Sequence, residues 1–212
     1  MDERLYSPST RRNREPIAAV LRRCLPATGA VLEIASGTGE HVAWFAAQFP
    51  GVVFQPSDPG PTQRASIAAW IAATGRENIR PPLALDVTSP DWAKNADIPA
   101  PLAAILCINM IHISPWAATL GLMRGAGQLL ADGGVLYLYD AYKRAGRHTA
   151  PSNAAFDESL RAQNPDWGVR DLEAVVAAAE VRGFALLEIV EMPANNFSVI
   201  LRHRPASLAQ ST

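Results

Sequence analysis

Near its start, the chain carries an acid and two glycines at a spacing that could hold a nucleotide. Residues 31–34 are apolar except for Glu33, and they predict a buried parallel strand. Gly37 and Gly39 follow, where the backbone has to turn tightly and come close to a ligand. Residues 40–47 then predict a helix whose first N–H groups are free to bind. A strand, a glycine turn and a helix N-terminus make a nucleotide-binding corner.

Two residues of this corner argue against a dinucleotide. The G-x-G-x-x-G fingerprint requires a third glycine at the position of Val42, whose side chain hinders a close approach of helix and strand. Glu33 precedes the turn, where its carboxylate would repel phosphate. An acid at this position suits a ligand with a cationic end, such as the sulfonium and ammonium groups of S-adenosylmethionine. We therefore expect that cofactor at the glycine turn, with S-adenosylhomocysteine as its product.

Two aspartates follow later strands of the expected sheet. Asp58 comes just after the expected strand 52–55 and about 20 residues beyond the glycines, where an acid typically binds ribose hydroxyl groups. It could also be a turn or N-cap residue of the next helix. Asp86 ends a short expected strand at 83–85. Its carboxylate could accept a hydrogen bond from an adenine amino group, or it could close a local turn.

The strongest signal for a buried strand, at 102–109, ends in Asn109 and is followed by Met110 and His112. In a doubly wound sheet, the loops after the carboxyl ends of the strands line the ligand crevice. Asn109 and His112 are therefore expected to face the chemistry. His112 is the first candidate for a general base, although a single histidine is also common as a hydrogen-bonded structural residue.

Residues 140–168 lose their periodicity and predict a polar insertion on the substrate side of the site. Tyr142, His148 and Asp157 are reserve candidates for a base in this insertion. A solvated loop with one short helix would explain the same composition. Three basic residues could clamp an anionic small molecule or could simply be solvated: Lys143, Arg144 and Arg147.

The composition fits one globular domain. At 212 residues, with 49% hydrophobic and 18% charged residues, the chain is long enough for one α/β domain and short for two. A formal net charge of −1 gives no general attraction to nucleic acid or to an anionic membrane. Cys24 and Cys107 lack the spacing of metal ligands or redox pairs. With no apolar leader, we expect a cytoplasmic monomer or homodimer that acts on a small molecule and binds no metal, nucleic acid or membrane.

We expect a single domain of the α/β class with a Rossmann-like, doubly wound sheet of seven strands. The sheet is mostly parallel, has helices on both faces and closes in an antiparallel hairpin formed by 184–192 and 197–201. Residues 1–15 are expected to form a polar arm ahead of a helix at 16–25, and 203–212 a disordered tail. The remaining expected strands are 31–34, 52–55, 83–85, 102–109 and 135–139, and the remaining expected helices are 40–47, 61–73, 116–130 and 170–182.

This plan resembles that of the class I S-adenosylmethionine-dependent methyltransferases, with Ala35 in place of the more usual first glycine. More specifically, the chain resembles an uncharacterised family that includes methyltransferase-like protein 26. The resemblance rests on residues 12–17, 32–41, 55–58, 108–116, 142–143, 152–153, 156–157 and 167–170. It implies a cofactor site lined by Glu33, Ala35, Ser36, Gly37, Gly39, His41, Asp58, Asp86, Asn109 and Met110. It also suggests a shared polar pocket formed by Asn13, His41, His112 and Asn153.

The activity expected from these features is in-line methyl transfer from a sulfonium to a small-molecule acceptor. A base is required only if the acceptor must lose a proton. One alternative is a non-catalytic protein that binds S-adenosylmethionine. Another is a NAD(P)-dependent oxidoreductase, which Glu33, Val42 and the terminal hairpin disfavour. Methylation of nucleic-acid bases is disfavoured by the charge, and residues 109–112 stand where such methylases have Asn/Asp-Pro-Pro-Tyr.

Overall fold

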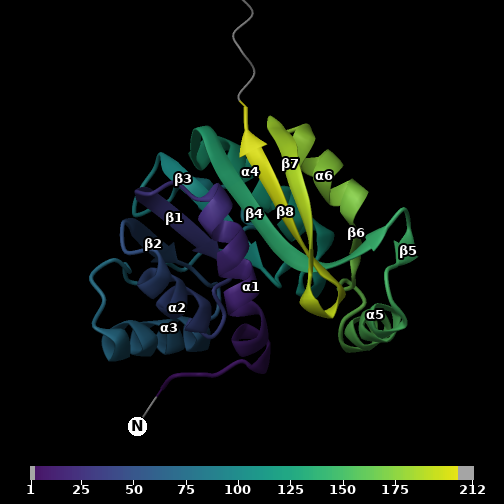
Figure 1. Cartoon of the computed structure of the whole chain (residues 1–212), viewed down its shortest axis with the longest axis horizontal. Coiled ribbons are helices and arrows are strands. Elements are labelled where there is room, and N and C mark those ends of the chain that lie inside the picture. Colours follow the sequence, from purple (N-terminus) through teal and green to yellow (C-terminus); the bar gives the residue numbers. More distant parts are fainter. Residues whose placement is uncertain (1–2, 205–212) are drawn as a thin grey trace, which may run out of the picture.

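A computed structural model describes residues 3–204 as one twisted sheet with helices on both of its faces (Figure 1). In sheet order its main strands are β2 (Val52–Pro56), β1 (Gly29–Ile34), β3 (Leu102–Ile108), β4 (Leu130–Arg144), β8 (Asn196–His203) and β7 (Phe184–Met192). The first four run parallel, and β8 is antiparallel to both of its neighbours. The carboxyl ends of the parallel strands therefore meet at one edge of the sheet.

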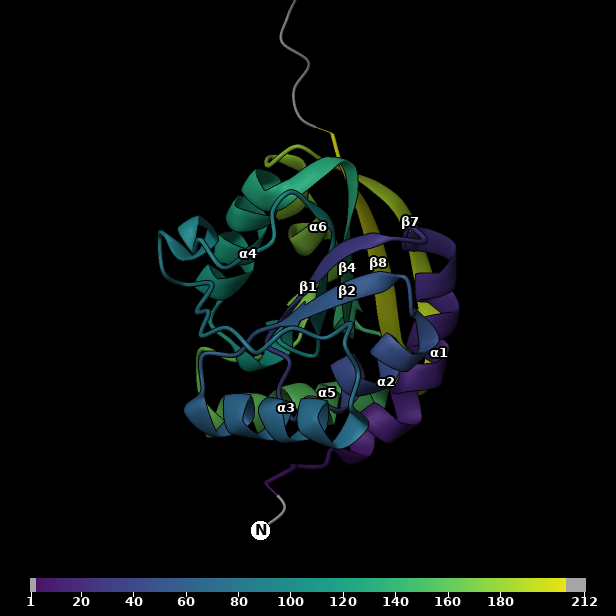
Figure 2. The same cartoon turned by 90° about the vertical axis from the view of Figure 1, so that its left-hand side faces the viewer.

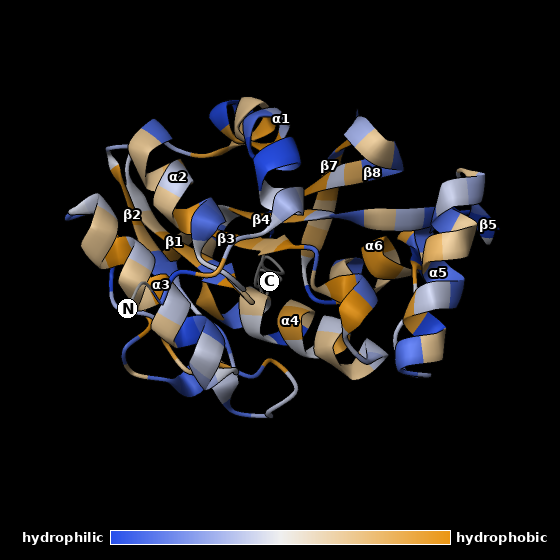
Figure 3. Cartoon of the chain, turned by 90° about the horizontal axis from the view of Figure 1, so that it is seen from below, coloured by the Kyte–Doolittle hydropathy of each residue, from blue (hydrophilic) through white to orange (hydrophobic). Residues whose placement is uncertain are grey.

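The helices form two layers that bury separate apolar cores. On one face lie α1 (Pro8–Cys24), α2 (Glu40–Gln48) and α3 (Pro61–Thr74), and on the other lie α4 (Trp116–Leu129) and α6 (Leu172–Glu180). Figure 3 looks onto the edge where the parallel strands end, with α1 and α2 above the sheet and α4 below it. At that same end of the molecule, α3 and α5 (Pro151–Gln163) lie on either side (Figures 1 and 2).

The α/β class, the helices on both faces and the closing hairpin agree with the expected fold, but the strand count of seven is wrong. The sheet has eight strands, because β5 (Arg147–His148) and β6 (Arg170–Asp171) pair with a long extension of β4. The strand expected at 83–85 does not form, and Leu83 makes only an isolated bridge to Ser57. Pro81 and Pro82 precede it and lack the N–H groups that a ladder needs.

The N-terminal helix begins earlier than expected, at Pro8 rather than at Pro16. Most of the segment expected to be a polar arm is therefore helical. Four of its five arginines are exposed, whereas Arg14 is half-buried beside Trp44. Thr10, Asn13 and Ile17 recur at helical spacing on the buried face. A buried asparagine at this position cannot be recognised as a core residue from the sequence, because its burial depends on a partner in another helix.

The insertion expected at 140–168 is more ordered than a solvated loop. It consists of the end of β4, the short strand β5 and the helix α5, and it is followed by β6. The expected tail at 203–212 is wrong at its start, since His203 belongs to β8, and residues 205–212 lie outside the described part of the chain. Within residues 3–204, no helix is both long and apolar enough to cross a membrane.

Tyr142 does not reach the site for which it was predicted. Its side chain points from β4 into the apolar core beneath α6 and is fully buried. Burial raises the pKa of Tyr142 well above its ordinary value, and the hydroxyl oxygen has no hydrogen-bond partner. Tyr142 therefore lies in the core and not among the residues of the cavity described below, and this position gives no support to its predicted catalytic role.

We expect Tyr142→Phe to leave the free energy of unfolding unchanged or to raise it by about 1 kcal/mol, because an unpaired buried hydroxyl is costly. The matched control is Tyr137→Phe in the same strand. Tyr137 is as deeply buried, but its hydroxyl lies 2.6 Å from Ser198 Oγ. This control should lose about 1 kcal/mol. Urea denaturation of both variants measures the difference, and a clear loss of stability in Tyr142→Phe would contradict the expectation.

Candidate functional site

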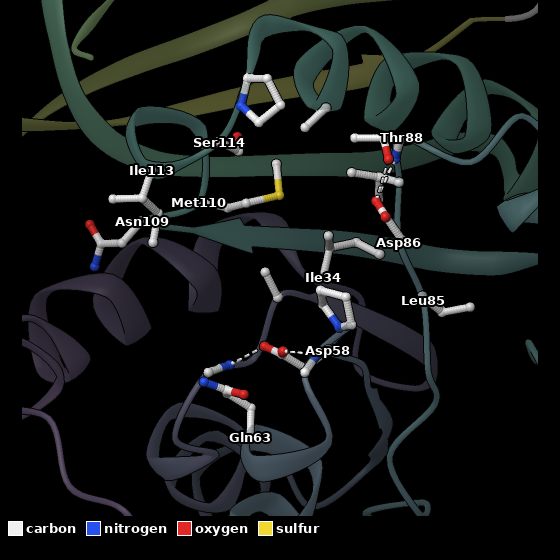
Figure 4. Close-up of a pocket in the computed structure, with 17 residues that line it drawn as sticks. Ile34, Asp58, Gln63, Leu85, Asp86, Thr88, Asn109, Met110, Ile113 and Ser114 are labelled. Carbon is white, nitrogen blue, oxygen red and sulfur yellow. Dashed lines mark hydrogen bonds between the residues drawn. The ribbon is translucent and has the colours of Figure 1, made fainter. Parts of the chain in front are cut away.

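A cavity of about 630 Å³ lies at the edge of the sheet where β1, β2 and β3 end. Its lining residues come from four segments, 34–37, 58–63, 85–88 and 109–118, not every residue of which faces the cavity. Figure 4 shows Asp58 and Gln63 on one side of the cavity and Met110 and Ser114 on the other. Its volume is within the range of sites that bind a small-molecule cofactor. Six of the predicted cofactor residues line it: Ala35, Gly37, Asp58, Asp86, Asn109 and Met110.

Asp58 shapes the floor of this cavity. One carboxylate oxygen accepts the N–H of Gly37 at 3.0 Å, and the other accepts the N–H of Gly60 at 2.9 Å. These bonds join the turn after β1 to the turn that begins α3. Burial raises the pKa of Asp58, although both N–H groups and Arg64 oppose that shift. The carboxylate therefore closes a turn and also faces the cavity, which combines the two roles considered for it.

Gly37 and Gly39 have different structural roles in the turn. Both have positive φ angles, +57° at Gly37 and +88° at Gly39. A Cβ on Gly37 would meet no atom closer than 4.0 Å, so its open side faces the cavity. A Cβ on Gly39 would lie only 2.9 Å from the Cα of Ile67, so Gly39 lets α3 approach the turn. Gly39 does not line the cavity.

Glu33 lies behind the lining residues, at the end of β1. Its side chain is 2% exposed, and its Oε2 has no hydrogen-bond partner. Burial raises the pKa of Glu33 to about 7, with a smaller raising effect from Asp58 and a lowering one from Ser36. The Ser36 hydroxyl also accepts the N–H of Ser57 at 3.2 Å, so Ser36 supports the turn from behind. A buried carboxyl with a free oxygen fits a ligand that brings a positive charge.

Asp86, Asn109 and Met110 form the other part of the lining. Asp86 is exposed, and its Oδ1 accepts two hydrogen bonds from Thr88, from the N–H at 2.9 Å and from the hydroxyl at 2.7 Å. It therefore closes a local turn while it faces the cavity. Asn109 has a φ of +58°, and its N–H donates to the carbonyl of Tyr139 at 2.8 Å. This left-handed residue turns the chain out of β3 and leaves Met110 over the cavity.

His112 does not line the cavity. It lies in the short helix η2 (Ile111–Ile113), and its Nδ1 bonds the Oδ1 of Asp140. The same carboxylate accepts the N–H of Ile111 at 3.0 Å and the N–H of Ala141 at 2.8 Å. Burial lowers the pKa of His112, but the charge and hydrogen bond of Asp140 outweigh it, and the net direction is upward. Because Nδ1 is bound, Nε2 is the ring nitrogen that could take a proton.

Sequence reasoning gave Asp140 no role, although a signal was present. Asp140 directly follows the apolar run of β4, much as Asp58 follows that of β2. An acid at the carboxyl end of a parallel strand belongs to the edge where ligands bind. Asp140 is 1% exposed, so only a partner in the same site explains its burial.

His41 is held away from the cavity by the N-terminal helix. Its Nε2 lies 2.8 Å from Oδ1 of Asn13, and its ring stacks on Phe45. Burial lowers the pKa of His41 to about 3, with a further lowering by Arg14, so the ring is neutral. His41 therefore joins α2 to α1, and its predicted contact with the cofactor is not formed with the residues of this cavity.

The basic and acidic residues of the insertion pair with one another. Lys143, His148 and Asp157 form one group, and Arg144 pairs with Glu173 at 3.0 Å. The anion clamp considered for Lys143, Arg144 and Arg147 is therefore not assembled, because the first two already have carboxylate partners. His148 and Asp157 face each other rather than the cavity. Among residues 3–204, no three potential metal ligands gather.

Solved structures with this fold include several methyltransferases. An O-methyltransferase family protein from Burkholderia thailandensis matches with a TM-score of 0.75 and 17% identity, over 92% of this chain and 57% of that one. The S-adenosylmethionine-dependent methyltransferase SibL gives 0.74 and 19%, over 92% and 56%. The mitomycin 7-O-methyltransferase MmcR gives 0.76 and 16%, over 92% and 54%.

This chain thus spans a little over half the length of those proteins, and at such identities the likeness shows the fold alone. The family is shown by a different comparison. A model built for a family described as "Protein of unknown function (DUF938)" matches residues 4–203, which is nearly the whole chain. The protein therefore belongs to the DUF938 family and has the fold of the S-adenosylmethionine-dependent methyltransferases.

Proposed function

We propose that the protein binds S-adenosylmethionine in the 630 Å³ cavity and transfers its methyl group to a small molecule. The observation that carries this proposal is Glu33, a fully buried carboxyl with an unpartnered oxygen next to the glycine turn. Among the hydrogen bonds and ion pairs of residues 3–204, none reaches this oxygen. A ligand with an ammonium and a sulfonium supplies the missing charge. A phosphate-rich dinucleotide does not.

The lining residues fit the remaining parts of such a cofactor. Asp58 retains free lone pairs beside its two backbone bonds and would hold the ribose hydroxyls. Asp86 and the apolar residues around it would hold the adenine. Gly37 leaves the backbone open to the amino-acid end. When bound, the cofactor supplies an electrophilic methyl group on a sulfonium.

The chain's own contribution to catalysis is to position the acceptor and to take up its proton. Holding two reactants in line in a closed site is worth about 7–11 kcal/mol of the barrier. His112 is the proposed base, and Asp140 holds it in the tautomer that presents Nε2 and stabilises the proton that it gains. An acceptor hydroxyl, as the names of the O-methyltransferase neighbours suggest, is a group that needs such a base.

The proposal also covers the acceptor, the location, the oligomeric state and the partners of the protein. The small-molecule acceptor, the cytoplasmic location, the monomeric or homodimeric state and the absence of a nucleic-acid or membrane partner rest on sequence arguments alone. We also propose that the chain belongs with the family that includes methyltransferase-like protein 26. A non-catalytic cofactor-binding protein is the second candidate, because fold alone does not establish activity. The His112–Asp140 pair supports the enzyme, because a buried carboxylate that holds Nδ1 leaves Nε2 of the ring to act as a base.

Calorimetric titration of the protein with S-adenosylmethionine, S-adenosylhomocysteine and NAD tests the cofactor. We expect micromolar binding of the two adenosyl compounds and none of NAD. Asp58→Ala should weaken binding at least tenfold, because it removes a cavity-facing carboxylate that also holds the turn. Asp132→Ala, which changes an exposed aspartate at the opposite end of β4, is the matched control and should bind normally. Binding of NAD alone would refute the proposal.

Glu33 gives a prediction about pH. Its pKa is raised from 4.5 to about 7 in the folded protein, so the folded state keeps a proton that the unfolded state releases. The stability that this proton confers is full below pH 4.5 and is lost as pH rises through about 7. Glu33 should therefore make the ligand-free protein less stable at pH 7.5 than at pH 4.5 by an amount on the order of 3 kcal/mol. Glu33→Gln should abolish that part of the pH dependence in urea denaturation.

The same ionisation links Glu33 to the cofactor. A cationic ligand favours the carboxylate, so binding near pH 6 should release a proton, which calorimetry in two buffers of different ionisation enthalpy detects. Glu33→Gln should release none. Binding without proton release in the unmodified protein, or a stability profile that Glu33→Gln leaves unchanged, would remove Glu33 from the site.

His112→Gln tests the base once a metabolite screen has provided an acceptor. Turnover should fall about 10²- to 10⁴-fold, the usual value of a general base, while the Kd of S-adenosylmethionine stays within about twofold. In the unmodified enzyme, turnover should rise with pH through the raised pKa of His112, because only the neutral ring accepts a proton. The variant should lose that rise. Unchanged turnover would exclude His112 as the base.

A further inference from the structure

Another buried carboxylate organises the insertion between β4 and α6. Asp157 of α5 is 5% exposed. Its Oδ2 lies 2.9 Å from Lys143 Nζ and 3.3 Å from His148 Nε2, and its Oδ1 lies 3.1 Å from Arg161 Nε. The same Oδ1 accepts the N–H of Val169 at 2.8 Å. One side chain therefore joins β4, β5, α5 and the loop that leads into β6.

That loop is in turn bonded to the segment that carries His112. The N–H of Gly168 donates to the carbonyl of His112 at 2.9 Å, one residue before the amide that Asp157 holds. The guanidinium of Arg170 donates to the carbonyl of Ser114 at 2.8 Å. Residues 168 and 170 thus bond the backbone of η2 and of the residue that follows it.

The helix α5 adds a direct contact to the same ring. Phe156, the neighbour of Asp157, packs edge-on against His112, with ring centroids 5.0 Å apart. Phe156 is 38% exposed whereas His112 is only 7% exposed, so the phenyl ring covers the histidine while part of Phe156 faces solvent. A shift of α5 would therefore move both the ring that covers His112 and the loop that holds its backbone.

Gly168 shows how closely the loop is fitted to the carboxylate. Its φ is +146°, which a side chain rarely allows, and a Cβ there would lie 2.7 Å from Oδ1 of Asp157. Only glycine lets the loop pass this close to the acid. The contact is therefore built into the backbone and does not depend on the side chains of an exposed ion pair.

We propose that Asp157 is a positioning residue, which holds the 168–170 loop so that η2 presents His112 to Asp140 and to the acceptor. The effect of Asp157 on catalysis rests on the proposed function. The bonds that connect Asp157 to η2 through residues 168–170 are present in the fold whatever the function is. Asp157 was considered above as a base, and the geometry points to this other role. An amide in its place carries no charge for Lys143 and Arg161, and its single acceptor oxygen could not also serve His148 and the N–H of Val169, so the group would loosen.

Glu173 lies in α6, just after the insertion, and provides a matched control. Its carboxylate accepts the Nε–H of Arg144 and the N–H of Ala145, both at 3.0 Å. It therefore resembles Asp157 in pairing with a cation and with a backbone amide. Unlike Asp157, it has no contact with residues 168–170 or with η2 among the described hydrogen bonds and ion pairs. Glu173→Gln removes the same charge without touching the proposed link.

The experiment is amide hydrogen exchange by NMR on Asp157→Asn, Glu173→Gln and the unmodified protein. The informative amide is that of Ile111, which donates to Asp140 and makes no contact with Asp157. We expect its exchange to become at least tenfold faster in Asp157→Asn and to stay unchanged in Glu173→Gln. The ring resonances of His112 should move in the first variant alone. Arg161→Gln, which removes one partner of Asp157, should give the same changes at smaller size if Asp157→Asn folds poorly.

Binding and turnover complete the test. Asp157→Asn should lower kcat about tenfold or more and leave the Kd of S-adenosylmethionine unchanged, because Asp157 does not line the cavity. If only the amide of Val169 exchanges faster while Ile111 and His112 keep their behaviour, Asp157 is a local ion pair and the proposal is wrong. If the unmodified protein binds no adenosyl compound, the proposed function fails, whereas the exchange result still decides the link between Asp157 and η2.

Discussion

A carboxylate removed from water has to be paired, and this constraint determines how the functional end of the molecule is built. Four buried acids meet it with partners from the protein, and one of them, Glu40, accepts the N–H of Ser7. Asp58 accepts two backbone N–H groups, and Asp140 bonds a histidine and two N–H groups. Asp157 pairs with one lysine, one arginine, one histidine and one N–H. Glu33 is the exception, with a free oxygen in a fully buried position. The same physical rule therefore explains the shape of the site and indicates what is missing from it.

Each of these acids holds together parts of the chain that are far apart in sequence. Asp58 joins the turns after β1 and β2, and Asp140 joins the ends of β3 and β4 through Ile111 and His112. Asp157 extends that assembly into α5 and the loop before β6. Because the strands are parallel, their carboxyl ends carry these residues to one edge, and the bonds run from strand to strand along it. The cavity and the base lie on adjacent parts of this edge.

The sequence was informative where local chemistry decides the structure. The run of 31–34, the glycine turn and the helix after it follow from residue types and spacing, and so does the closing hairpin. The sequence was misleading where contacts between residues far apart in the chain determine the structure. Asn13 is buried in a helix because His41 bonds it, and the insertion is ordered because several of its residues converge on Asp157. The position of Asp140 after an apolar run indicates that it lies at the ligand-binding edge. Only its contact with His112 shows that it orients a histidine.

Two titrations in the proposed mechanism act in the same direction. The burial of Glu33 raises its pKa to about 7, so the carboxylate that would attract a cationic cofactor forms more readily as pH rises. Asp140 raises the pKa of His112 above its ordinary value, so the neutral ring that would accept a proton also becomes common only at higher pH. Loading of the cofactor and readiness of the base are therefore both favoured on the alkaline side of neutrality. One residue lies in the sheet and the other in a turn beyond it, and the burial of acids at a single edge of the sheet accounts for both shifts.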